Sequence, residues 1–89
     1  MRAVWNYPLK MVSTQIFEIP ENPLFLHVSM EKDGPNLLVE VNTLINTKPY
    51  TIEMVTTGKM LSGPDKRKYI DSFHIKDNTW HVYLKESNE

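Results

Sequence analysis

Hydrophobic residues recur at every second position along most of this chain. In the segment 24–30, leucine, valine or methionine occupies each even position, whereas Phe25, His27 and Ser29 occupy the odd ones. Successive side chains of a β-strand point to opposite faces, so this period predicts strands, and no helical spacing is sustained along the chain. We therefore expect an all-β fold, a small antiparallel sandwich or partly open barrel of about seven strands. The expected strands are residues 3–9, 15–19, 24–30, 37–42, 50–57, 69–76 and 79–85.

A first hairpin is expected around the dipeptide Asp33-Gly34, where glycine can adopt a positive φ. A tight loop centred there pairs apolar residues throughout, namely Met30 with Leu37, Val28 with Val39 and Leu26 with Val41. A slip of one residue would turn the whole set to the other face, so this agreement supports the register. The expected core residues are Leu26, Val28, Val39, Val41, Phe73, Ile75, Trp80 and Val82.

A second hairpin is expected around Asp77-Asn78, two residues that tolerate the left-handed conformation of tight turns. This register places His74 directly opposite His81. The two imidazoles could share a metal ion, but zinc normally takes four ligands and the remaining histidine, His27, lies in the other hairpin. We therefore expect no metal site and two histidines on a polar face.

The composition is that of one folded domain. We expect a single β domain over residues 1–89, in which residues 86–89 form a polar tail. Ten basic and eleven acidic residues give a net charge of −1, which disfavours generic nucleic-acid binding. The absence of cysteine excludes disulfides and cysteine-bound metals. No apolar run has the length of a signal peptide or a membrane span, so we expect a cytoplasmic protein that does not bind membranes.

The residue patterns of the common enzyme classes do not occur in this chain. No serine lies in a Gly-x-Ser-x-Gly elbow. The carboxylates Glu18, Glu40, Glu53 and Asp71 fall on separate expected strands at positions that alternate outward, where charges usually contact water. We therefore expect no catalytic residue, no cofactor and no enzymatic activity.

A basic segment follows the fifth expected strand. It contains Lys59, Lys66, Arg67 and Lys68 together with two glycines, but it lacks the glycine spacing and the following helix of a phosphate-binding loop. Its simplest interpretation is a solvated surface loop. These four cations are nevertheless the candidates for an anionic ligand.

Apolar residues also fall on the face opposite the expected core. They are Phe25, Leu38, Val55, Ile70 and Tyr83. Several such residues on neighbouring strands can form an interface, or a closed barrel can bury them, and both interpretations remain open. If the face is exposed, the candidates for binding a partner or a second copy of the chain are Phe25, His27, Leu38, Glu40 and Tyr83.

A series of short motifs extends from Val4 to Glu86. The series comprises Val4-Trp5-x-Tyr7-x-Leu9, Gln15-Ile16-x-Glu18-Ile19-Pro20, Phe25-Leu26-x-Val28, Gly34-Pro35, Leu38-x-Glu40-Val41, Thr57-Gly58, Tyr69-Ile70-x-Ser72-Phe73 and His81-Val82-Tyr83. In this order the motifs resemble a family of short uncharacterised proteins of tailed bacteriophages and prophages. The resemblance implies a small β-rich accessory protein made in the cytoplasm of the infected bacterium.

We expect such a protein to act by binding. The expected partner is a host protein, such as a defence or transcription component, which it would inhibit or modulate, and the free protein is expected to form a homodimer. One alternative is an oligomer that sequesters a nucleotide signal through Lys59 and Lys66, Arg67 and Lys68. Another is a minor structural protein of the virion.

Overall fold

The fold is seen in a computed structural model that describes residues 1–61, 63 and 66–86. Parts of the basic segment and residues 87–89 of the expected tail therefore lie outside the described residues. Within the described part of the chain, no helix is long and apolar enough to cross a membrane.

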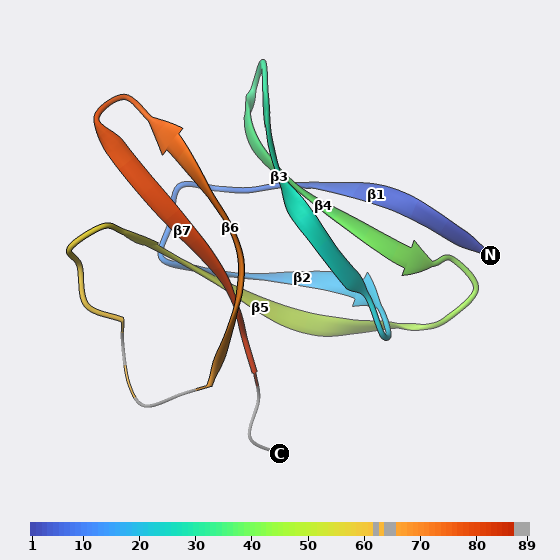
Figure 1. The fold of residues 1–89 in the computed structure, drawn as a ribbon. Helices are drawn as coiled ribbons and strands as arrows, with labels where there is room; N and C mark the ends of the chain where they lie inside the picture. The colour runs from blue at the N-terminus through green and yellow to red at the C-terminus, as the bar shows by residue number, and fades with distance from the viewer. Residues whose placement is uncertain (62, 64–65, 87–89) are drawn as a thin grey trace.

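Seven antiparallel strands make up the described fold, which confirms the all-β prediction (Figure 1). The alternating pattern located each of them to within a few residues. The strands are β1 (Arg2–Pro8), β2 (Thr14–Pro20), β3 (Leu24–Glu31), β4 (Gly34–Asn42), β5 (Thr47–Thr56), β6 (Arg67–Ile75) and β7 (Asn78–Lys85).

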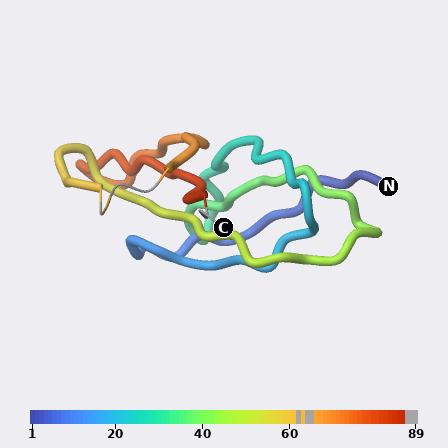
Figure 2. The backbone as a smooth tube through the Cα atoms, turned by 90° about the horizontal axis from the view of Figure 1, so that it is seen from below, coloured from blue at the N-terminus to red at the C-terminus, as the bar shows by residue number. Residues whose placement is uncertain are grey.

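The strands form two sheets that pack face to face. Sheet A has the order β1-β4-β3, and sheet B has the order β2-β5-β7-β6. Neither sheet closes into a barrel, so the fold is an open sandwich. Figure 2 shows β3 and β4 in one layer and β2 and β5 in the other, with the β6–β7 hairpin at the end away from the N-terminus. The molecule is a thin slab of 40 × 35 × 15 Å.

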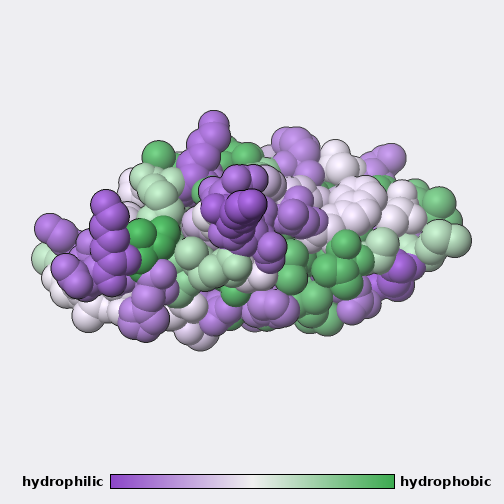
Figure 3. Space-filling view, turned by 90° about the horizontal axis from the view of Figure 1, so that it is seen from above, coloured by the Kyte–Doolittle hydropathy of each residue, from purple (hydrophilic) through white to green (hydrophobic). Residues whose placement is uncertain are grey.

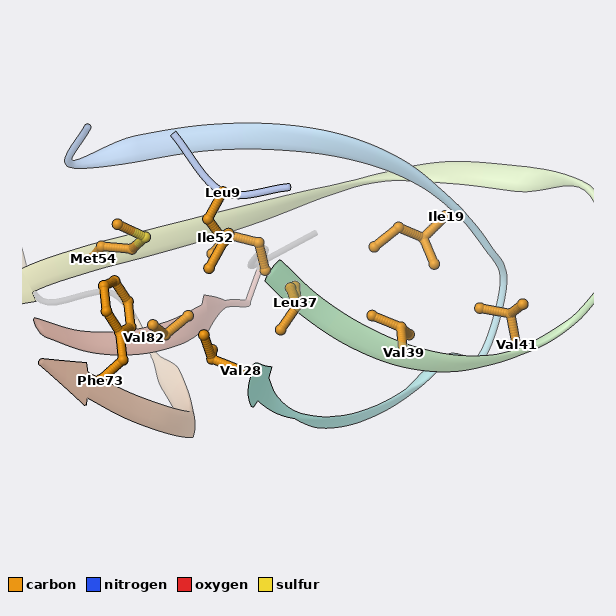
Figure 4. Packing of buried hydrophobic residues seen from close by; sticks show 10 residues of the cluster. All are labelled: Leu9, Ile19, Val28, Leu37, Val39, Val41, Ile52, Met54, Phe73 and Val82. Carbon is orange, nitrogen blue, oxygen red and sulfur yellow. The ribbon is translucent and has the colours of Figure 1, made fainter. Parts of the chain in front are cut away.

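The hydrophobic core lies between the two sheets. Figure 4 shows side chains of β2 and β5 facing those of β3 and β4. The buried hydrophobic residues are Leu9, Ile19, Val28, Leu37, Val39, Val41, Ile52, Met54, Phe73 and Val82. Of the expected core residues, Ile75 and Trp80 are half-buried against this cluster, whereas Leu26 is 36% exposed and lies outside it.

The register of the β3–β4 hairpin differs from the prediction by two residues. Val28 pairs with Leu37 rather than Val39, because the loop consists of Lys32 and Asp33 and is not centred on Asp33-Gly34. A β-bulge at Leu26 then interrupts the alternation of β3. A bulge adds one residue to one strand, so it reverses the faces of all residues beyond it. Phe25 consequently points into the sandwich, where the sequence pattern had placed Leu26.

The β6–β7 hairpin shows the same two-residue difference. Its loop consists of Lys76 and Asp77, and Lys76 takes the positive φ of 55°. His74 therefore pairs with Thr79, and the predicted His74–His81 pairing is wrong. A second bulge lies at Ile70 in β6.

Two carboxylates that were expected in solvent are held inside the protein instead. Glu53 is 4% exposed and forms an ion pair with Arg67 on the neighbouring part of sheet B. Asp71 faces sheet A, where its Oδ2 accepts a hydrogen bond of 2.8 Å from the backbone N–H of Val28. This Asp71–Val28 bond joins the edge strands β3 and β6 of the two sheets. Of the other two carboxylates, Glu18 is exposed as predicted, and Glu40 is half-buried on the outer surface of sheet A.

Candidate functional site

The outer surface of sheet A carries a patch of apolar side chains from all three of its strands. We call it the outer patch; its members are Val4, Leu24, Leu26, His27 and Leu38, with Arg2 and Glu40 among them. Val4 and Leu24 lie on either side of Glu40 in one row of the sheet, and His27 lies opposite Leu38 in the next row. Val4 is 56% exposed and Leu24 is 53% exposed. The patch is thus a mainly apolar surface open to solvent.

Arg2 and Glu40 form an ion pair in the outer patch. The Arg2 Nε donates to Glu40 Oε2 at 2.9 Å, and the guanidinium also donates to the backbone carbonyl of Glu40 at 3.3 Å. Both side chains stay accessible, at 45% and 36% exposure. A pair this exposed contributes at most about 1 kcal/mol to stability. Its charges therefore remain free to contact a partner.

Three of the five predicted partner-binding residues, His27, Leu38 and Glu40, come together in the outer patch. Phe25 does not join them, because the bulge turns it inward, where its ring meets the edge of Tyr50 at a centroid distance of 6.1 Å. Tyr83 lies on the outer surface of sheet B, in edge contact with Tyr69 at 5.8 Å. The five residues therefore do not share one surface.

A chain of hydrogen bonds crosses the outer surface of sheet B. The Tyr69 hydroxyl contacts Ser72 Oγ at 2.8 Å, Ser72 Oγ contacts His81 Nδ1 at 3.0 Å, and His81 Nε2 contacts Thr57 Oγ1 at 2.7 Å. Sequence reasoning missed this network, because it depends on His81 lying opposite Ser72 in the observed register.

The distance of 3.0 Å between Ser72 Oγ and His81 Nδ1 is typical of a nucleophile and its general base in an enzyme. In hydrolases, however, a third group, usually a carboxylate, orients the imidazole. Here the second nitrogen of His81 meets the hydroxyl of Thr57. The hydroxyl of Ser72 is also shared with Tyr69. This arrangement suits a structural network that fixes the surface of the β6–β7 hairpin.

The four candidate cations are not gathered at one place. The guanidinium of Arg67 is occupied by the buried Glu53, with a second contact of 3.4 Å between its Nη2 and Glu53 Oε2. Lys66 is exposed just before β6. Lys59 and Lys68 line two different pockets. Among the described residues, no group of three or more histidine, cysteine or acidic side chains could hold a metal ion.

Two of the pockets among the described residues include candidate cations in their walls. The first, of about 330 Å³, lies between the β1–β2 connection and the segment after β5, and Met11, Met54, Lys59 and Trp80 are among its lining residues. The second, of about 450 Å³, lies between the first halves of β3 and β6. Sequence reasoning missed both, because each one combines segments that are distant in the chain.

Comparison with known protein families identifies the family of this chain. The model of a family described as a domain of unknown function, DUF7352, matches residues 1–89. The chain belongs to the DUF7352 family. No curated protein and no solved structure matches this DUF7352 chain. The expected membership of an uncharacterised family of small proteins is thereby confirmed.

Proposed function

We propose that this protein acts by binding another protein through the outer patch of sheet A. In this proposal it is a phage-encoded accessory protein that works in the cytoplasm of the bacterial host. It inhibits or modulates a host component such as a defence or transcription protein. The motif series resembling short phage proteins supports the origin, and the outer patch supports the mode of action.

The observation that carries this proposal is the exposure of Val4, Leu24 and Leu26 on one face of a three-stranded sheet. Single exposed hydrophobic residues are common on soluble proteins and need no explanation. A group of them on adjacent strands, next to a half-buried Leu38, is the pattern of an interaction surface. Covering it with a partner removes apolar area from water, which favours association.

The shape of the patch favours a protein over a small molecule. Small ligands usually bind in concave sites, whereas protein interfaces use broad surfaces with an apolar centre and polar residues around it. Figure 3 shows the narrow side of the slab, where hydrophobic side chains (green) also reach the surface between hydrophilic ones (purple). Arg2 and Glu40 present both signs of charge at 2.9 Å. The patch therefore fits a partner that offers an acidic and a basic side chain around an apolar contact.

Charge substitutions within the patch test the proposal. We would immobilise the wild type and the double variant Val4→Glu with Leu26→Glu, expose them to host lysate, and quantify the retained proteins by mass spectrometry. The matched control is Ile16→Glu, which changes a residue that is 64% exposed on the outer surface of sheet B. We expect the wild type and the control to retain the same host protein, and the double variant to lose it.

Thermal unfolding first verifies that all three proteins fold. Binding of the purified host protein is then measured directly, and its dissociation constant should rise at least about tenfold in the double variant, which corresponds to about 1.4 kcal/mol. Equal binding by all three proteins would contradict the proposal. Recovery of the protein as a component of purified virions would also contradict it, because that result indicates a structural role.

A further inference from the structure

The second pocket is built where the two sheets separate. It has a volume of about 450 Å³ and is lined by Leu24 and Phe25 from β3, Tyr50 from β5, Lys68, Tyr69 and Ile70 from β6 and Leu84 from β7, together with Asn22 and Pro23 of the β2–β3 connection. Small-molecule sites usually have volumes of about 300–1,000 Å³. The pocket is therefore large enough for a compact ligand.

The course of the β3 and β6 backbones explains why the second pocket is open. The Asp71–Val28 bond holds β3 and β6 together in the middle of the molecule. The bulges at Leu26 and Ile70 both lie on the pocket side of this bond, one in each strand. Bulges bend a strand and increase its twist, so the two strands diverge on that side. The strand geometry thus accounts for the opening, and the β2–β3 connection adds Asn22 and Pro23 to its wall.

The walls of the pocket are mainly aromatic and aliphatic. Phe25 and Tyr50 meet edge to face at 6.1 Å, and both pack against the core. Ile70 and Leu84 are half-buried there as well. Aromatic rings prefer edge-to-face or offset contacts with other rings. The pocket can therefore accept a planar aromatic group that packs against these side chains.

In the described part of the chain, one charged side chain lines the pocket. Lys68 pairs with Leu84 at the start of β6, and its side chain is exposed at the mouth of the pocket. Among the described residues, no hydrogen bond or ion pair engages its ammonium group. The ammonium is therefore available to an anionic group of a ligand in the pocket, because a hydrogen bond between an ammonium and an anion is stronger than a neutral one.

We propose that this pocket binds a small molecule that carries one aromatic ring system and one anionic group, a carboxylate or a phosphate. The ring system lies among Phe25, Tyr50 and Ile70, and the anionic group contacts the ammonium of Lys68. The pocket borders the outer patch at Leu24, but Phe25, Tyr50, Ile70 and Lys68 do not belong to that patch. Binding there does not require the protein partner of the proposed function.

Two-dimensional NMR titration of the whole chain tests this site. The probes are 2-naphthoate, 2-naphthyl phosphate and the uncharged 2-naphthamide. We expect both anionic probes to shift the backbone amide signals of Phe25, Tyr50, Ile70 and Leu84, and the amide probe to bind more weakly. The tighter of the two anions identifies the group that the site prefers.

Two lysine variants separate a specific contact from general attraction. Lys68→Gln removes the charge that lines the pocket, whereas Lys66→Gln removes the charge of a lysine two residues away that does not line it. Lys68→Gln should weaken binding of the anionic probes about tenfold, because it removes a charged hydrogen bond to the anionic group. Lys66→Gln should change it less than about twofold.

Several outcomes would overturn the proposal. They are shifts that lie outside the pocket, equal weakening by the two variants, equal affinity for the charged and uncharged probes, and no shifts at millimolar probe. The Val4→Glu with Leu26→Glu variant should bind the anionic probes like the wild type. This result keeps the pocket and the outer patch distinguishable if one of the two proposals fails.

Discussion

The hydroxyl group of Tyr7 is a residue-scale weakness of the core. Its oxygen is buried and has no hydrogen-bond partner among the described residues, while its ring packs against Phe17 at a centroid distance of 5.5 Å. Tyr7→Phe keeps the ring and removes the unpaired polar atom, so we expect the free energy of unfolding to rise by about 1 kcal/mol. Urea denaturation at neutral pH measures this change in the free energy of unfolding. The control Tyr69→Phe removes a paired hydroxyl on the surface and should not stabilise the protein.

The same burial predicts how stability depends on pH. Burial raises the pKa of the Tyr7 hydroxyl above its ordinary value of 10.0. The folded state therefore holds this proton more tightly than the unfolded state. Below pH 10 the protonated hydroxyl costs the wild type no further stability. As the pH rises through the pKa of the folded state, the free energy of unfolding of the wild type falls, because the unfolded state loses this proton more easily. The advantage of Tyr7→Phe over the wild type should therefore grow between pH 9 and pH 11, and an advantage that stays constant over this range would contradict the assignment.

The Glu53–Arg67 pair differs from the Arg2–Glu40 pair mainly in burial. The side chains of Arg67 and Glu53 are only 10% and 6% exposed. Loss of one member leaves the other charge buried, so Arg67→Met should lower the free energy of unfolding by about 3–5 kcal/mol. Arg2→Met breaks the exposed pair and should cost under about 1 kcal/mol. Chemical denaturation measures the free energy of unfolding of both variants. Equal losses of stability would show that burial does not determine the cost of breaking the ion pair.

At the scale of elements, alternation alone was sufficient to locate the strands. Each strand has one face in the core and one face outward, so the alternation of apolar and polar residues shows directly where the strand lies in the sequence. The registers of the two hairpins were harder to predict, because both two-residue loops begin one residue earlier than the favoured turn residues suggest. Gly34, for example, has a φ of 124° and lies at the first position of β4, opposite Glu31.

The bulges explain most of what sequence reasoning missed at the candidate sites. His27, Leu38 and Glu40 were assigned together because simple alternation holds for them. Phe25 was assigned to the wrong face because the bulge at Leu26 depends on how β3 meets β4 and β6. Tyr83 was grouped with them because a strand's membership of a sheet is set by contacts between distant segments.

The Asp71–Val28 bond should be an important link between the two sheets. Asp71→Ala leaves the N–H of Val28 without its partner and should lower the free energy of unfolding by about 1–3 kcal/mol. Asp33→Ala, in the exposed β3–β4 loop, should cost under about 0.5 kcal/mol. Hydrogen exchange gives a local measurement, in which the Val28 amide should exchange faster in Asp71→Ala. Unchanged protection of this amide would contradict the role of Asp71.

On the scale of the whole molecule, the thin slab exposes more surface than a rounder protein would. Its accessible surface is 6029 Å². A monomer of this mass is expected to expose about 5,400 Å². A standard protein interface covers about 800 Å² on each partner. Pairing through one broad face would therefore bring the exposed surface down to an ordinary value.

We predict that the free protein forms a dimer through the outer patch. Two copies related by a two-fold axis can bring Arg2 of one copy to Glu40 of the other while covering their apolar neighbours. Sedimentation velocity should show a dimer for the wild type and for Ile16→Glu, and a monomer for Val4→Glu with Leu26→Glu. A monomeric wild type, or a double variant that remains fully dimeric, would contradict this prediction. A host protein would compete with the second copy for the same surface.

The order of strands in the two sheets also governs how the chain is made and folded. The β3–β4 and β6–β7 hairpins close over two-residue loops, so they can form locally within microseconds. By contrast, β1 pairs only with β4, where Arg2 meets Asn42, and β2 pairs only with β5. On the ribosome, both N-terminal strands must therefore wait for partners that are synthesised later. Chaperones that hold nascent chains would meet β1 and β2 during the interval before β4 and β5 are synthesised.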